Sequence, residues 1–170
     1  PQDHADDPVR DFGLAVDLLR EAMDLEGGEV AACTDTLGYL ARATRYSLVG
    51  DKGKNLREAR RLHSLRIERL YLDGASPDEI ANAQHCLAGV EDQMGGGDRL
   101  ARVEEVERQM ATAALTAESP AKQAELAASL AWQKTQVGLA RNGDVETLRG
   151  ALTAFDQIDK ELLSSNMLRS

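Results

Sequence analysis

The chain has 170 residues, 42% of them hydrophobic and 29% charged, which predicts one folded domain and excludes a disordered chain. Its net charge of −9 disfavours general binding to nucleic acid or to an anionic membrane, and no apolar run is long enough to cross a bilayer. Aromatic residues make up only 4% of the chain. Because strands are enriched in aromatic and β-branched residues, this composition favours helices.

The first predicted helix covers residues 8–26. Asp7 is a suitable N-cap, Pro8 fits the first helical position, and Gly27-Gly28 ends the helix. A second helix is predicted from about Glu29 to Val49, and a third follows a short polar link and stops before Gly74. In each helix the apolar residues recur three or four positions apart, which places them on one face. Those of the second and third helices are Cys33, Leu37, Leu40, Thr44 and Leu48, then Leu56, Ala59, His63, Ile67 and Leu70.

The fourth helix has the strongest start signal in the sequence. Ser76-Pro77-Asp78-Glu79 predicts a capping box, in which the Ser and Glu side chains bond the first backbone N–H groups. Three further helices follow by the same reasoning, which gives about seven helices and no strand. Their boundary signals are Gly95-Gly96-Gly97 and Asp98, then Ser119-Pro120, then Gly143-Asp144.

The short connections predict that successive helices pack antiparallel as αα-hairpins within a single domain over residues 1–170. Glycine turns near Gly50, Gly96 and Gly143 recur every 46 or 47 residues. This spacing indicates a repeated helix pair. The predicted pairs are 29–72, 77–117 and 120–163, with helix 8–26 as an additional N-terminal element.

These residues resemble the tetratricopeptide repeat (TPR) family, in which an early aromatic residue, a Gly-Asp turn and a small residue on the second helix recur. The matching positions are Trp132, Leu139 and Gly143-Asp144; Leu87, Ala88 and Ala101; and Gly50-Asp51 with Ala59. The period is longer than the 34 residues of the family. The resemblance implies a TPR-like α-solenoid with a concave groove, and it places Trp132 in the core. A closed helical bundle is the alternative fold.

Signatures of catalysis and of cofactor or metal binding are lacking. The triple glycine is followed by Asp98 and Arg99 and not by the Lys-Ser/Thr of a phosphate loop, and no His-Glu-x-x-His occurs. His63 shares an apolar stripe, and a role in packing is expected for it. We therefore predict a non-enzymatic protein without cofactor or metal. Cys33 and Cys86 are expected to be small buried residues of a reducing compartment, which implies a cytoplasmic location.

Basic residues are concentrated in one part of this acidic chain. Nine of the twenty fall between positions 42 and 69: Arg42, Arg45, Lys52, Lys54, Arg57, Arg60, Arg61, Arg66 and Arg69. They form either a solvated face offset by Glu58 and Glu68, or a docking patch for carboxylates, which the planar guanidinium of arginine can bind in a bidentate manner.

Two tyrosines lie near this patch. Tyr39 and Tyr46 are seven residues apart on one face of the second helix, with Arg42 close to that face. Tyrosine and arginine are enriched at interaction hot spots, although core packing explains the tyrosines equally well. The predicted partner-binding residues are Tyr39, Arg42, Arg45, Tyr46, Arg57, Arg60 and Arg61.

The predicted function is therefore an interaction scaffold, one module of a larger regulatory protein, that binds a protein or an acidic peptide in a helical groove. One alternative is a nucleic-acid-binding regulator that uses the basic patch, although the net charge opposes it. Another is a small-ligand carrier or enzyme accessory domain, for which His63, Thr44 and Cys33 are the candidate polar groups of the core.

Overall fold

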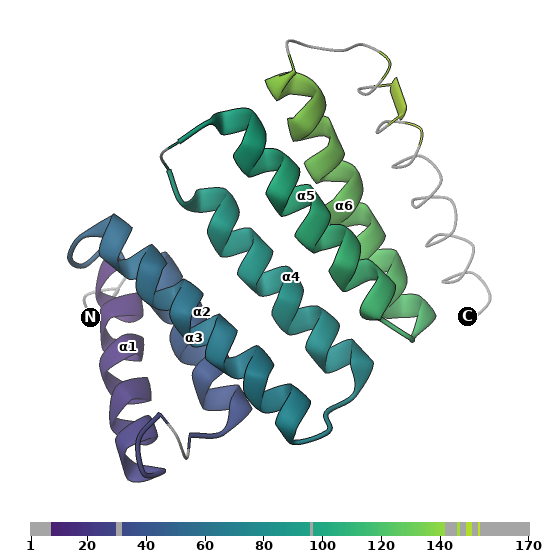
Figure 1. Ribbon diagram of the computed structural model, residues 1–170. Helices are drawn as coiled ribbons and strands as arrows, with labels where there is room; N and C mark the ends of the chain where they lie inside the picture. The colour runs from purple at the N-terminus through teal and green to yellow at the C-terminus, as the bar shows by residue number, and fades with distance from the viewer. Residues whose placement is uncertain are drawn as a thin grey trace, which may run out of the picture. The chain divides into compact units, whose positions relative to one another are not determined.

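The computed structural model describes residues 8–29, 32–95 and 97–141, together with Glu146, Arg149, Gly150 and Thr153. Over these residues the protein has six α-helices and no strand, which confirms the predicted all-α class (Figure 1). The predicted seventh helix lies almost wholly outside the described residues. The six helices are α1 (Pro8–Leu25), α2 (Thr34–Tyr46), α3 (Lys52–Leu72), α4 (Pro77–Gln93), α5 (Arg99–Thr116) and α6 (Pro120–Ala140).

The chain divides into two compact units, of which the first contains α1, α2 and α3. Here α2 packs against both α1 and α3. Leu37, Leu40 and Ala41 of α2 meet Val16 of α1 and Leu62 of α3 in one buried cluster. These α2 residues are three and then one position apart, so they lie on one face of the helix. Residues of α1 and α3 together cover that face.

The start of α2 differs from the prediction. The helix begins at Thr34 instead of about Glu29, because Cys33 is its N-cap and its sulfur accepts the backbone N–H of Thr36 at 3.4 Å. Glu26 completes this cap by accepting the backbone N–H of Cys33 and the hydroxyl of Thr36, both at 2.9 Å. These bonds, led by the one from Cys33, lower the pKa of the Glu26 carboxyl. The prediction of a buried Cys33 is wrong, because a capping thiol at this position is exposed.

The end of α2 also falls earlier than predicted. Ser47 caps the helix, and its backbone N–H bonds the carbonyl of Ala43 at 2.9 Å. Leu48 therefore lies beyond the helix and is exposed, so its predicted place in the apolar stripe is wrong. Gly50 has a φ of +84°, a conformation that glycine adopts without steric cost, and it turns the chain into α3.

The second unit contains α4, α5 and α6 (Figure 1). Its core is rich in alanine: Ala81, Ala113, Ala117 and Leu126 form one cluster, and Ala88, Val106 and Met110 form another. Small side chains allow the helices to approach closely. Trp132 is 55% exposed, so its predicted core position is wrong. The neighbouring Ala131 and Gln133 are buried instead, and the amide of Gln133 donates to the Val103 carbonyl at 3.1 Å.

Three side chains at the start of α4 fix helix ends in this unit. The predicted capping box is confirmed: the Ser76 hydroxyl accepts the Glu79 backbone N–H at 3.3 Å, and the Glu79 carboxylate accepts the Ser76 backbone N–H at 3.0 Å. Asp78 accepts the backbone N–H groups of Glu118 and Ser119 at 2.8 and 3.1 Å. Hydrogen bonds from Ser119 and Glu118 lower the pKa of the Asp78 carboxyl.

The capping box gives a first prediction. Replacing Ser76 by alanine removes an acceptor from the first turn of α4, so we expect the free energy of unfolding to fall by about 1 kcal/mol in urea titrations. The Ser129→Ala variant is the control, because Ser129 lies inside α6, where alanine is the better helix former. Equal stability of the two variants would contradict this role of Ser76.

Candidate functional site

The predicted partner-binding residues all lie in the first unit, on α2 and α3. Leu37, Leu40, Ala41 and Thr44 fill the inward face of α2, so residues on the opposite side of this helix point away from the core. Tyr39 is 63% exposed, Arg42 is exposed, and Tyr46 is 38% exposed. These three residues, spaced three and four positions apart, form a surface that we call the α2 face. The structure thus places both tyrosines outside the core.

The aromatic end of the α2 face is held in place by its neighbours. The ring of Phe12, from α1, lies 5.9 Å from the ring of Tyr46, centroid to centroid. The Arg45 guanidinium carbon lies 5.0 Å from the centroid of the same ring, within the range of a cation–π contact. Arg45 is half-buried. Because these contacts restrict the Tyr46 ring, less side-chain entropy is lost when a partner covers it.

Arg61 is already engaged by two carboxylates of its own chain. Its guanidinium donates to both oxygens of Glu29 at 2.6 and 2.5 Å, and to both oxygens of Glu58 at 2.9 and 2.8 Å. The bonds to Glu58 and Glu29 raise the pKa of Arg61, and Arg61 in turn lowers the pKa values of both carboxyls. Four of its five N–H donors are therefore committed. Its role is to tie α3 to the residues that follow α1, so Arg61 does not fit the predicted role of a docking residue.

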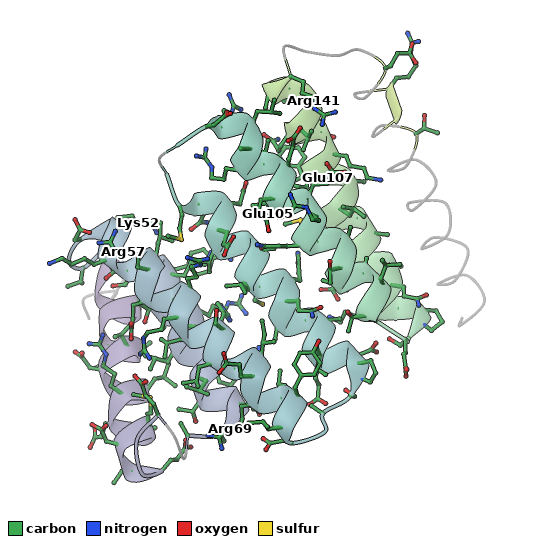
Figure 2. All side chains as sticks on the ribbon, in the orientation of Figure 1. Lys52, Arg57, Arg69, Glu105, Glu107 and Arg141 are labelled. Atoms are coloured by element: carbon green, nitrogen blue, oxygen red, sulfur yellow. The ribbon has the colours of Figure 1, made fainter. Side chains whose placement is uncertain are left out.

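Four other basic residues of the patch lie in the first three turns of α3: Lys52, Lys54, Arg57 and Arg60. Arg57 and Arg60 are exposed, and Figure 2 shows Lys52 and Arg57 at the start of this helix, with Arg69 near its other end. Lys52 donates to the Arg45 carbonyl at 2.7 Å and so satisfies the C-terminal end of α2. Cations oppose the dipole at a helix N-terminus. Asp51 offsets part of this cost, since its carboxylate accepts the Lys54 backbone N–H at 2.6 Å.

Next to the α2 face, Arg66 and His63 of α3 lie close to α2, an arrangement that the sequence patterns did not predict. The Arg66 guanidinium crosses Gly38 so closely that a Cβ at position 38 would lie 2.9 Å from it. His63 is only 2% exposed. Burial, with the charges of Arg66 and Arg45, lowers the pKa of His63 to about 4. A neutral His63 therefore lies near two guanidinium groups. The basic patch already includes Arg45 and Arg66, and Gly38, a glycine inside a helix, is the sequence signal for the close approach of Arg66 to α2.

Other classes of site find little support in the described part of the chain. No group of three or more His, Cys, Asp or Glu side chains there is placed to hold a metal ion. None of the described helices has the length and apolar character needed to cross a bilayer.

Comparison with protein-family models, with curated proteins and with solved structures finds no match. The resemblance to TPR proteins thus stays a prediction.

Proposed function

We propose that this protein is a non-enzymatic interaction module whose α2 face binds an acidic segment of a partner protein. The observation that carries the proposal is Arg42, an exposed cation between two exposed tyrosines that makes no ion pair with any described residue. Tyrosine and arginine are the residues that contribute most often to binding hot spots. A carboxylate of the partner can engage the guanidinium while an apolar side chain covers the Tyr39 ring.

The charge around the α2 face favours an acidic partner. Arg45 and Arg66 add positive potential next to the α2 face, and Arg57 and Arg60 extend it along the start of α3. The Lys52 bond to the Arg45 carbonyl joins the end of α2 to this start, so the two basic regions meet. Because the whole chain carries a net charge of −9, a local cationic surface selects for acidic ligands while the remainder repels polyanions.

We also propose that the helix pairs belong to a TPR-like α-solenoid. The 46-residue recurrence of glycine turns and the close packing of α2 with α3, the two helices of the first predicted pair, support this arrangement. Helical repeats present extended surfaces for protein partners. A binding scaffold is therefore the function that agrees with both the proposed repeat and the α2 face.

Substitutions on the α2 face test the binding proposal. The probe is a fluorescein-labelled peptide of alternating Glu and Leu residues, and binding is followed by fluorescence anisotropy at low salt. We expect Arg42→Ala and Tyr39→Ala each to weaken binding about tenfold, since loss of a hot-spot side chain costs about 1–2 kcal/mol. Added salt should weaken binding by the unsubstituted chain more than by Arg42→Ala.

The matched controls are Arg108→Ala on α5 and Tyr71→Ala on α3, both exposed and both outside the α2 face. If these controls lose as much affinity as the α2-face variants, the binding surface is elsewhere. A labelled DNA duplex is measured in parallel. Tighter binding of DNA than of the peptide would favour a nucleic-acid regulator and overturn the proposal.

A further inference from the structure

A cavity of about 230 Å³ opens between α1, the C-terminal end of α2 and the first turn of α3. Its polar lining comes from all three segments: Asp17 and Arg20 from α1, Thr44 and Ser47 from the end of α2, and Asn55 from α3. Val16 and Val49 supply apolar walls. The cavity is separate from the α2 face, since none of Tyr39, Arg42 and Tyr46 lines it.

Local packing keeps this cavity open. Gly13 has no side chain to fill it, and a Cβ at this position would lie 3.3 Å from a methyl group of Val49. The Asn55 amide donates to the carbonyls of Ser47 and Val49 at 3.3 and 2.9 Å, which fixes the turn between α2 and α3 as one wall. Hydrogen bonds within the chain therefore hold the turn between α2 and α3 in place beside the cavity.

The polar atoms of the lining have capacity for further bonds. Thr44 is 3% exposed, and its hydroxyl makes no hydrogen bond. A buried hydroxyl without a partner destabilises a fold, so its retention here calls for an explanation. Asn55 uses its amide nitrogen and leaves its carbonyl oxygen as an acceptor. Ser47 accepts the Val49 backbone N–H at 3.2 Å, so its hydroxyl proton remains available to donate.

The two charged residues of the lining restrict the kind of ligand. Asp17 and Arg20 lie three positions apart on α1, where side chains share one face, yet no ion pair joins them. A simple anion would meet repulsion from Asp17, and a simple cation would meet repulsion from Arg20. A molecule that carries both an ammonium and a carboxylate group complements the pair.

We propose that this cavity binds a small zwitterion of the free α-amino-acid class. The ligand carboxylate would pair with Arg20 and its ammonium group with Asp17, while Thr44, Ser47 and Asn55 offer hydrogen bonds to polar atoms deeper in the cavity. Size agrees with this class. An apolar cavity of about 150 Å³ holds benzene, so by the same scale this one holds about nine non-hydrogen atoms. The site adds a small-molecule ligand to a protein whose proposed partner binds elsewhere.

The test uses the full chain and isothermal titration calorimetry with each of the twenty free amino acids, and with acetate and methylammonium as ligands of single charge. We expect at least one amino acid to bind and both single-charge ligands to bind at least tenfold more weakly. Absence of binding by every amino acid at millimolar concentration would overturn the proposal, and so would acetate or methylammonium binding as tightly as the best amino acid.

Variants then locate the site. Asp17→Asn, Arg20→Gln and Thr44→Val should each weaken the best amino acid at least tenfold, and circular dichroism verifies that each variant is folded. Asp24→Asn on α1 and Arg108→Gln on α5 are matched controls, because neither residue lines the cavity. Equal losses in variants and controls would exclude this cavity. Arg42→Ala should leave amino-acid binding unchanged, so failure of the partner-binding proposal and failure of this one are distinguishable.

Discussion

Acidification from pH 7 to pH 4.5 is expected to lower the free energy of unfolding of the first helical unit by about 2–3 kcal/mol through His63 alone. His63 has a pKa of about 4 in the folded protein, against 6.5 for an unperturbed histidine, because burial and then the charges of Arg66 and Arg45 oppose protonation. The unfolded chain therefore binds this proton first. The contribution of His63 to stability is complete above pH 6.5 and is lost as the pH falls toward 4.

The carboxyl groups act at lower pH. Glu26, Glu29 and Glu58 have lowered pKa values, so their stabilising contribution is complete above about 4.5 and is lost below it. Between pH 6.5 and 4.5, the change in the free energy of unfolding is therefore expected to come chiefly from histidine. Urea titrations across this interval on the unsubstituted chain and on His63→Leu make the comparison. The variant should show little dependence on pH here, and a variant that loses stability as steeply as the unsubstituted chain would assign the effect to another group.

Shortening a side chain in the buried cluster of the first unit should change the free energy of unfolding by an equally large amount. Leu62 is fully buried against Leu37 and Leu40, so Leu62→Ala should lower the free energy of unfolding by about 2–5 kcal/mol through lost burial and a residual cavity. Leu126→Ala should have a similar cost in the second unit, where Leu126 is likewise buried.

The control for Leu62→Ala is Leu72→Ala on the same helix, where the side chain is exposed and the cost should be below about 0.5 kcal/mol. Amide hydrogen exchange then shows which helices lose stability in each variant. Leu62→Ala should reduce protection chiefly in α1, α2 and α3, and Leu126→Ala chiefly in α4, α5 and α6. Equal loss of protection throughout both units in either variant would show that the core clusters are not local to their units.

Helix starts were predicted best where a short polar side chain precedes the helix. The Asp98 and Ser119 side chains each accept a backbone N–H of the first turn, as the Ser76 capping box does. Asp51 caps α3 in the same way, although residues 51–54 were predicted to be a link. These signals are local, since cap and helix lie within four residues. Cys33 was misassigned because a thiol is rarely a cap and because the carboxylate that completes this cap, Glu26, belongs to the preceding segment.

Long-range features of the site were not predictable from periodicity. The α2 face followed from the spacing of Tyr39, Arg42 and Tyr46, but whether the tyrosines were buried depended on which sides of α2 its neighbours cover. The engagement of Arg61 by Glu29 joins residues 32 positions apart. The cavity combines three segments and depends on the missing side chain of Gly13, so no pattern within a single helix could predict it.

Asp78 has a consequence for how the second unit tolerates change in chain length. Its carboxylate holds the residues before α6 to the start of α4 across 40 positions, while the glycine-rich connection between α4 and α5 lies at the opposite end of α4. The entropy of closing a loop grows only with the logarithm of its length. A longer α4–α5 connection therefore costs little loop-closure entropy as long as Asp78 tethers the far end of α4.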